Sequence, residues 1–352
     1  MPLLTRMVPA PLVVEIRRGA VHDLGAVLAD QRISSGGRVA VAVSATSGAA
    51  IADELRDELS NADFFSVAVA TVDAAISLVD EVRRDSYDAI VGIGGGRVLD
   101  ATKFAAARLG LPMVSVATNL AHDGIGSPVS TLDNDAGRGS YGVPAPIAVL
   151  VDLELVRRAP PRAVRAGIGE ALSNLSAVRD WRLAHEVVGE TVDGLALMLA
   201  RSAGEAVLHH PEGVDSDAFL TTLAESLVLS GLAMVVAGTS RPSSGACHEI
   251  SHAIDMLHRD RAGYHGEQVG MGAAFATWLR GEHELFERLV AALRRHGLPV
   301  APAELGFDEA EFAAIVDHAP QTRPGRHTVL EHRALGLREL RASVADYVAA
   351  LA

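Results

Sequence analysis

Strand-like and helical patterns alternate along the N-terminal part of the chain, and this alternation most constrains the fold. Short β-branched runs such as Arg38–Ser44 and Ala89–Ile93 are each followed by apolar residues at helical spacing. Such runs are typical of buried parallel strands, and a helix joining two of them makes a βαβ unit. From Leu153 onward the sequence has helical patterns and no convincing strand. It therefore predicts a Rossmann-like α/β domain over residues 1–155 and an all-α domain over residues 156–352.

The predicted elements divide in the same way. Strands are predicted at Arg38–Ser44, Phe64–Ala70, Ala89–Ile93, Leu111–Ala117 and Ile147–Val151, with helices between them at Ile51–Leu59, at Ala74–Arg84 and from Val98 onward. The Gly-, Asp- and Asn-rich stretch Asp133–Gly142 predicts a surface hairpin or a mobile loop. Helices of the second domain are predicted at Val164–Ala184, Thr191–Leu208, Asp217–Val236, His248–Leu257, Val269–Arg280, His283–His296 and Asp308–Asp317.

Composition restricts the partners. The 352-residue chain carries a net charge of −13 and has no long basic run, so we expect no nucleic-acid partner. The single cysteine, Cys247, allows no internal disulfide and fits a reducing cytoplasm. The first residues lack the cationic start of a signal peptide, and the apolar stretch Leu227–Gly238 is too short to span a bilayer. The sequence therefore predicts a cytoplasmic protein without membrane insertion.

Three consecutive glycines, Gly94, Gly95 and Gly96, join a predicted strand to the next helix. Amides at a helix start are unpaired and lie at its positive end, and without a Cβ an anion can approach them. The triplet therefore predicts a site for the pyrophosphate of a dinucleotide, although a tight βα turn explains it equally well, and its spacing is not G-x-G-x-x-G. In the following helix, Asp100 and Lys103 could form an ion pair, or Lys103 could face an anion.

A histidine-rich segment, Arg241–Gly270, contains candidate metal ligands. His248, His252 and Asp255 have the spacing of one helical face, and His265 follows after a break that contains glycine. A neutral imidazole is a common ligand for zinc and iron. The segment predicts a loop-plus-helix metal site, with a histidine-rich surface or contact helix as the alternative.

Two further polar features fit a ligand site. The loop Thr118–Gly124 follows a predicted strand, at the edge of an open α/β sheet where ligands bind. Glu170 lies in an otherwise small and apolar helical stretch, where an unpaired carboxylate is costly to bury. Its predicted partner is a cation, with Arg179 or exposure to solvent as the alternatives.

Together these motifs resemble glycerol-1-phosphate dehydrogenases, in the superfamily shared by iron-containing alcohol dehydrogenases, glycerol dehydrogenase and dehydroquinate synthase. The resemblance rests on GGGRVLDATKFAA (94–106), AHDGIGSP (121–128), AGIGEALSNLSAVRDWRLAH (166–185), SRPSSGACHEISHAID (240–255), HGEQVGMG (265–272) and TRPGRHTVL (322–330). It implies NAD or NADP as cofactor, one divalent metal ion, and reduction of dihydroxyacetone phosphate to sn-glycerol 1-phosphate or of a similar small phosphorylated ketone. We also expect a homo-oligomer.

The resemblance assigns roles to residues. It implies Glu170, His248 and His265 as metal ligands, with zinc expected first and iron or nickel as alternatives. It places Gly94, Gly95, Gly96, Asp100, Thr118 and Ser127 in the cofactor site. Asp123 matches an aspartate beside the substrate, and His252 an active-site histidine that is not a ligand. Arg323, Arg326 and His327 are candidates for the substrate phosphate, because arginine offers paired donors to phosphoryl oxygens, or else they are surface charges.

Two residues depart from the family pattern. Glu170 stands where these enzymes usually have aspartate, and Cys247 replaces the glutamate before the first ligand histidine. Glutamate is the choice of the dehydroquinate-synthase branch, so a sugar phosphate cyclase is an alternative function; the single lysine, Lys103, argues against it. A metal-dependent alcohol dehydrogenase for an unphosphorylated polyol and a metal-stabilised binding protein are further alternatives. Ser44 is not the acidic residue that favours a free ribose hydroxyl, and NAD and NADP both stay open.

Overall fold

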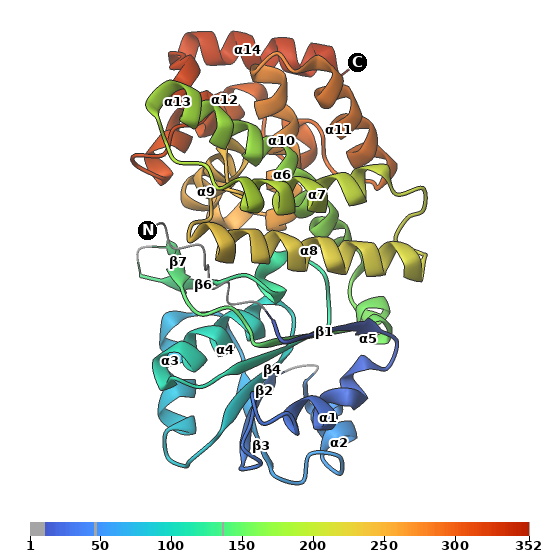
Figure 1. Ribbon diagram of the computed structural model, residues 1–352. Helices are drawn as coiled ribbons and strands as arrows, with labels where there is room; N and C mark the ends of the chain where they lie inside the picture. Colours follow the sequence, from blue (N-terminus) through green and yellow to red (C-terminus); the bar gives the residue numbers. More distant parts are fainter. Residues whose placement is uncertain (1–10, 46–47, 136, 352) are drawn as a thin grey trace, which may run out of the picture. The chain divides into compact units, whose positions relative to one another are not determined.

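The computed structural model describes residues 11–45, 48–135 and 137–351, which form two compact units (Figure 1). Unit 1 comprises the chain up to Asn119, residues 124–159 and residues 234–238. Unit 2 comprises residues 120–123, 160–233 and 239–352. The main boundary therefore lies just beyond the predicted division at residue 155, and two short segments cross it. The stretch 1–10, for which the sequence predicts no signal peptide, lies outside the described residues.

Unit 1 is built on a six-stranded parallel sheet with the order β1-β8-β5-β4-β2-β3. The strands are β1 (Val13–Arg17), β2 (Val39–Ser44), β3 (Ala62–Val67), β4 (Ala89–Gly94), β5 (Met113–Ala117) and β8 (Ala148–Asp152). The helices are α1 (Leu24–Leu28), α2 (Gly48–Leu55), α3 (Val72–Val82), α4 (Gly96–Leu109) and α5 (Leu153–Arg158). Every residue of β4, β5 and β8 is buried, as expected for strands covered on both faces. Figure 1 shows α3 and α4 on one side of the sheet and α1 and α2 on the other.

The strand order reverses between β2 and β4. After β2 the chain moves outward to β3, and it then returns to place β4 on the opposite side of β2. In open α/β sheets, ligands bind at the carboxyl ends of the strands beside such a switch point. Gly94 ends β4, and Gly96 begins α4. The glycine triplet therefore lies where this class of sheet binds dinucleotides.

The structure contains the five strands predicted from β-branched runs, with ends shifted by up to three residues. The predicted hairpin is also present, since β6 (Val129–Asn134) pairs antiparallel with β7 (Gly137–Gly142). The sequence did not predict β1, because this edge strand is only partly buried and follows Pro11. A half-exposed edge strand lacks the continuous apolar run that marks its neighbours.

Unit 2 is helical, and the described residues from 153 to 351 contain no strand. Its helices are α6 (Pro161–Val188), α7 (Gly194–His209), α8 (Asp217–Ala237, whose last turn is grouped with unit 1), α9 (Ala246–Leu257), α10 (His265–Leu279), α11 (His283–Arg295), α12 (Glu309–His318), α13 (Val329–Arg333) and α14 (Leu337–Ala350). The sequence did not predict α13 and α14. Helices α6 and α10 are buried over most of their length, which marks them as the core of this unit.

Helix α8 extends over Asp217–Ala237, one residue longer than predicted. By length and composition it is the one described helix that could cross a membrane, because its apolar window is longer than the stretch Leu227–Gly238, which by itself is too short. In the structure, 67% of that apolar window is buried, as in a core helix.

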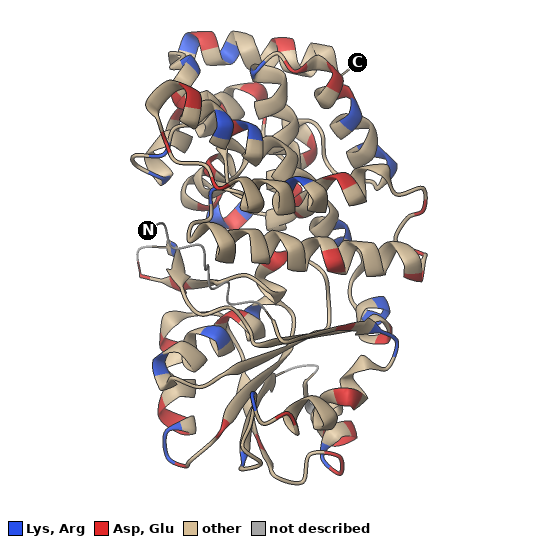
Figure 2. Ribbon diagram, viewed as in Figure 1, with Lys and Arg blue, Asp and Glu red and all other residues tan. Residues whose placement is uncertain are grey.

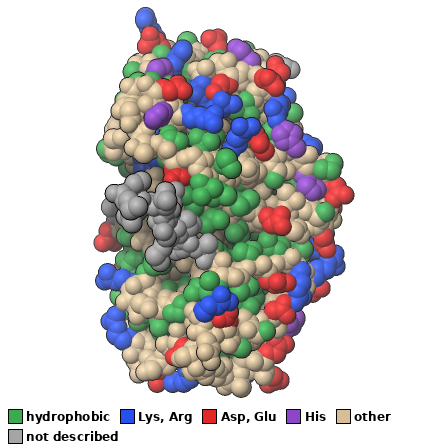
Figure 3. All heavy atoms as spheres, viewed as in Figure 1, with side chains coloured by type: hydrophobic (Ala, Val, Ile, Leu, Met, Phe, Trp, Pro, Cys, Tyr) green, Lys and Arg blue, Asp and Glu red, His purple; other side chains and the backbone are tan. Residues whose placement is uncertain are grey.

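Acidic and basic residues are interspersed along the chain (Figure 2) and over the face shown in Figure 3.

Candidate functional site

One carboxylate and two imidazoles converge inside unit 2. Glu170 lies on α6, His248 lies on α9, and His265 is the first residue of α10. Glu170 Oε1 is 4.0 Å from His248 Nε2, and Glu170 Oε2 is 3.6 Å from His265 Nε2. The three donor atoms all lie within 4.8 Å of one another. Three protein donors at this spacing can surround one divalent ion, to which each would bind at about 2.0–2.2 Å.

The electrostatics of this triad fit a cation. The Glu170 side chain is buried, and its Oε2 has no hydrogen-bond partner. Burial, followed by the charge of Asp123, raises the pKa of Glu170 well above its usual value. Burial, followed by the neighbouring His265, lowers the pKa of His248, which favours the neutral imidazole. A neutral imidazole can ligate a metal ion, and a bound cation would offset the cost of burying the carboxylate charge.

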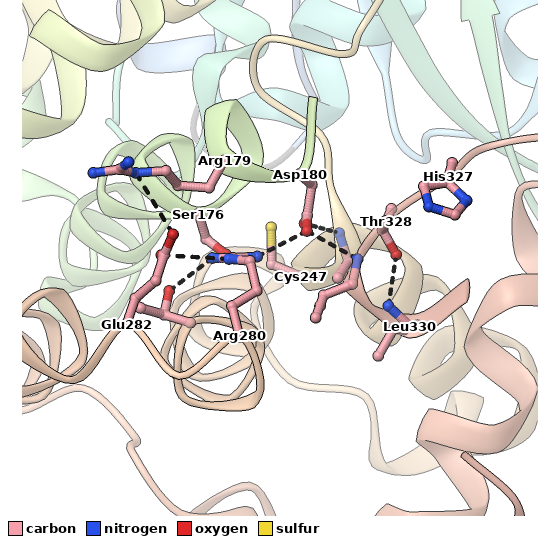
Figure 4. Close-up of polar contacts among 12 residues, drawn as sticks. Ser176, Arg179, Asp180, Cys247, Arg280, Glu282, His327, Thr328 and Leu330 are labelled. Atoms are coloured by element: carbon pink, nitrogen blue, oxygen red, sulfur yellow. Dashed lines mark hydrogen bonds and ion pairs between the residues drawn. The ribbon is translucent and has the colours of Figure 1, made fainter. Parts of the chain in front are cut away.

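The alternative partners of Glu170 are absent from its surroundings. Arg179 points to Glu282 instead, with 3.8 Å between Nε and Oε1 (Figure 4). Glu170 is 4% exposed, which leaves it no bulk solvent. Neither Arg179 nor bulk solvent therefore pairs with the Glu170 carboxylate in the structure.

Glycines allow helices α6 and α10, which carry Glu170 and His265, to meet through their backbones. A Cβ on Gly266 would overlap the carbonyl oxygen of Ala166, and a Cβ on Gly169 would overlap that of Gly266. Because Gly169 precedes Glu170 and Gly266 follows His265, this crossing brings the carboxylate and the imidazole together. The predicted break that contains Gly263 lies between the end of α9 at Leu257 and the start of α10 at His265. The predicted helix start at Val269 is wrong, because α10 already begins at His265 and Gly266 lies at its crossing with α6.

Asp180, also on α6, connects the helices that carry the ligands (Figure 4). Its Oδ2 accepts the backbone N–H of Ala246 at the start of α9, at 2.8 Å. Its Oδ1 accepts from Arg280 Nη1 at the end of α10, at 2.7 Å, and from the backbone N–H of Val329 at 3.0 Å. Asp180 is fully buried. One carboxylate therefore ties α6, α9 and α10 together; its position in the sequence carried no signal for this role.

His252 lies one turn beyond His248 on α9 but faces a different partner. Arg323 Nη2 lies 2.9 Å from His252 Nε2. An arginine only donates, so this nitrogen offers its lone pair to the guanidinium and not to a metal ion. The ring centres of His252 and His265 are 6.3 Å apart, whereas those of His248 and His265 are 5.0 Å apart. The structure places His252 beside the triad and outside it.

Asp123 lies against the triad within unit 2. Its backbone N–H hydrogen bonds to the Glu170 carboxylate, and its Oδ2 accepts from Ser230 Oγ at 2.9 Å. Gly167 allows this approach, because a Cβ there would overlap the carbonyl oxygen of Leu120. The segment Leu120–Asp123 packs on α6 for this reason and groups with the helical unit.

The three phosphate candidates have different surroundings. Arg326 Nη1 donates to the carbonyl and hydroxyl of Ser244, the latter at 2.8 Å, and its Nη2 donates to Ser240 Oγ at 3.0 Å. Burial, followed by the charge of Arg241, lowers the pKa of Arg326 to about 10. The backbone carbonyl of His327 accepts from Arg241 Nη2 at 2.8 Å. Arg326 therefore holds the segment Ser240–Ser244 in place by hydrogen bonds. Arg323 is the candidate whose hydrogen bond reaches a predicted active-site residue, His252.

Four of the cofactor candidates, Gly94, Gly95, Gly96 and Thr118, lie at the carboxyl ends of β4 and β5 in unit 1. The backbone N–H of Thr118 donates to the carbonyl of Gly94 at 3.1 Å, and Gly95 is an N-cap without a side-chain cap bond. The first amides of α4 therefore have no capping side chain, as an anion site requires. A Cβ on Gly95 would overlap the Asn119 side chain, a neighbour that the sequence did not indicate. Ser127 is buried in the same unit.

Asp100 and Lys103 form the ion pair that was one of two possibilities. Asp100 Oδ1 lies 2.9 Å from Lys103 Nζ, and Lys103 also donates to the carbonyl of Val129. Both side chains are buried. The single lysine of the chain therefore joins α4 to β6, and the Asp100 carboxylate faces Lys103.

Comparison with known sequences places this chain among dehydrogenases. Residues 15–160 match the family described as iron-containing alcohol dehydrogenase. The chain is 35% identical over 337 residues to a glycerol-1-phosphate dehydrogenase (NAD(P)+) of Methanothermobacter thermautotrophicus, covering 94% of this chain and 95% of the relative. It is 32% identical to the enzyme of the same name from Pyrococcus abyssi, covering 91% and 92%.

Solved structures share the fold at lower identity. A probable glycerol dehydrogenase from Sinorhizobium meliloti 1021 superposes with a TM-score of 0.77 at 23% identity, covering 99% of both chains. An iron-containing alcohol dehydrogenase from Thermococcus thioreducens gives a TM-score of 0.74 at 16% identity, covering 97% of this chain and 99% of that one. With this fold and relatives above 30% identity over nearly its whole length, the chain belongs to the glycerol-1-phosphate dehydrogenase family of iron-containing alcohol dehydrogenases.

Proposed function

We propose that this chain is a metal-dependent oxidoreductase that transfers hydride between NAD or NADP and a small phosphorylated ketone, with dihydroxyacetone phosphate and sn-glycerol 1-phosphate as its substrate pair. The triad of Glu170, His248 and His265 carries this proposal, because a bound cation would offset the cost of a buried carboxylate whose Oε2 has no hydrogen-bond partner. The names of the relatives support the substrate pair.

Zinc is the metal we propose, with iron or nickel as alternatives for the same donors. Two imidazoles and one carboxylate form a catalytic zinc set, which leaves a position for water or substrate. When bound, the ion supplies a Lewis acid that polarises the ketone oxygen. Glu170 contributes the negative charge, and His248 and His265 remain neutral donors.

Other residues bind the cofactor and move the proton. The amides that follow Gly94, Gly95 and Gly96 would bind the pyrophosphate of the dinucleotide. As hydride reaches the carbonyl carbon, its oxygen needs a proton, and Asp123 and His252 are the neighbouring groups that we propose for its delivery. Ser230 orients the Asp123 carboxylate.

The single lysine disfavours the cyclase alternative. Lys103 is buried in unit 1 and bound to Asp100 and Val129. It is therefore unavailable to a substrate that would call on several lysines.

The test is oxidation of NADH and of NADPH by the zinc-loaded protein, with dihydroxyacetone phosphate or dihydroxyacetone as substrate. We expect the phosphorylated ketone to be preferred. His265→Ala should lose zinc and activity together while it still binds NADH, because the glycine triplet lies in unit 1. Oxidation only by ketones without phosphate would reject the glycerol-phosphate assignment and leave a metal-dependent alcohol dehydrogenase.

A further inference from the structure

A line of three hydrogen bonds leads from Asp255 to His265 within unit 2. Gln268 Nε2 donates to Asp255 Oδ1 at 3.4 Å, and Ser251 Oγ donates to Gln268 Oε1 at 2.6 Å. Ser251 Oγ lies 2.9 Å from His265 Nδ1. Ser251 and Gln268 are 0% and 1% exposed, so water does not compete for these bonds.

The donors and acceptors available set the direction of every bond in this line. An ionised carboxylate only accepts, so the NH₂ group of Gln268 faces Asp255 and its carbonyl oxygen faces Ser251. A carbonyl oxygen also only accepts, so the hydroxyl proton of Ser251 points to Gln268. The hydroxyl then has only lone pairs to offer His265, and Nδ1 of His265 must carry the proton.

The remaining nitrogen of His265 is the one that faces the triad. With the proton on Nδ1, Nε2 carries a lone pair and no proton, and it lies 3.6 Å from Glu170 Oε2. We propose that Ser251 and Gln268 are positioning residues, which hold His265 in the Nδ1–H tautomer with Nε2 directed at the metal position. This inference rests on the proposed function in so far as an ion binds at the triad.

The Nδ1 atom of His248, the other proposed histidine ligand, has a weaker hydrogen-bond partner. His248 Nδ1 lies 3.3 Å from Cys247 Sγ, and sulfur is a weak acceptor. In metal sites, a ligand histidine is held through its second nitrogen by a hydrogen-bond partner. Removal of that partner weakens metal binding by roughly 10–100-fold. The hydrogen bonds from Asp255 through Gln268 and Ser251 therefore orient His265 more strongly than Cys247 orients His248.

Metal-free protein labelled with ¹⁵N-histidine provides the direct test. Long-range ¹H–¹⁵N spectra distinguish the two tautomers, and His265→Gln identifies the signals of His265. We expect the Nδ1–H tautomer in the wild type. In Gln268→Met the side chain has a similar size but no carbonyl, so the Ser251 hydroxyl can donate to Nδ1 and the Nε2–H tautomer should appear.

Zinc affinity, measured by competition with a chromogenic chelator, provides the second readout. Ser251→Ala and Gln268→Met should weaken zinc binding by roughly tenfold to a hundredfold. Ser251→Thr should restore it, because the hydroxyl is retained. Ser226→Ala is the matched control, since Ser226 is also buried but its Oγ has no hydrogen-bond partner.

The outcomes separate this inference from the proposed function. An Nε2–H tautomer in the wild type, or unchanged zinc affinity in both Ser251→Ala and Gln268→Met, would overturn the positioning role. If the wild type binds no divalent ion but shows the Nδ1–H tautomer, the metal-dependent function fails and the orientation of His265 stands.

Discussion

The carboxylate of Asp180 accepts a hydrogen bond from the backbone N–H of Ala246 at 2.8 Å, a contact between α6 and the first turn of α9. Helix α9 begins after Gly245, which has no side chain to cap it. A negative charge at this end satisfies an unpaired amide and complements the helix dipole. Asp180 therefore supplies from another helix the cap that the local sequence lacks, two residues before the proposed ligand His248.

We expect Asp180→Asn to destabilise the metal-free protein by about 3–5 kcal/mol, because breaking a buried ion pair removes the buried counter-charge of its partner. Arg280 would keep Glu282, Ser176 and Thr277 as partners but lose its one fully buried carboxylate. Urea unfolding followed by circular dichroism measures the loss.

Glu282→Gln is the control for this variant. Glu282 also pairs with Arg280, at 3.3 Å, but lies nearer the surface, where an ion pair contributes about 0–1 kcal/mol. If the two variants are equally stable, the buried carboxylate of Asp180 does not hold these helices together.

We expect Gly266→Ala to separate α6 from α10 and to lower zinc content. The new methyl group would overlap the Ala166 carbonyl, and overpacking of this kind costs about 1–3 kcal/mol. A shift of either helix increases the distance from Glu170 to His265. Zinc per chain after dialysis and the urea midpoint are the measurements, with Gly194→Ala as the control, because a Cβ at Gly194 meets nothing within 4 Å. Wild-type zinc content in Gly266→Ala would show that the crossing does not position the ligands.

The sequence predicted what local patterns encode. The runs that became β4 and β5 are continuous apolar stretches next to glycine or helix signals, so their strands and the cofactor loop could be located. Glu170 drew attention because a carboxylate is costly among small apolar residues. Histidine spacing identified α9, although spacing alone could not separate His248 from His252. The distances to Glu170 and His265 and the contact with Arg323 separate them.

Local sequence patterns could not predict contacts between segments that are distant in the sequence. Gly266 looks like a turn residue in the sequence, and its need for a bare backbone appears only where α6 crosses α10. The TRPGR motif suggested two equivalent phosphate-binding arginines. The structure distinguishes them because Ser240 and Ser244, far away in the sequence, occupy the guanidinium of Arg326.

A test of the proposed pyrophosphate site at Gly95 needs two substitutions, one at Gly95 and one at its neighbour Asn119. Any side chain at Gly95 would first collide with Asn119, so weaker cofactor binding by Gly95→Ala alone would not implicate phosphate. Asn119→Ala provides the space, and the double variant Gly95→Ala/Asn119→Ala then adds only a Cβ over the first amides of α4. We expect the double variant to bind NADH at least tenfold more weakly than Asn119→Ala, by fluorescence titration, since about 1.4 kcal/mol corresponds to a factor of ten. Equal affinities would show that the triplet is only a turn.

Phosphate selectivity should depend on Arg323 more than on Arg326. Arg323 Nη2 contacts His252 beside the triad, whereas Arg326 is bound to the serines of Ser240–Ser244. A charge-assisted contact to phosphate contributes roughly 1.5–3 kcal/mol, or about one to two powers of ten in affinity. We therefore expect Arg323→Ala to raise the KM for dihydroxyacetone phosphate by this factor relative to dihydroxyacetone, and Arg326→Ala to impair both ketones alike. Steady-state kinetics with both ketones make the comparison: equal losses in Arg323→Ala would remove Arg323 from the phosphate site, and a selective loss in Arg326→Ala would assign the phosphate to Arg326 instead.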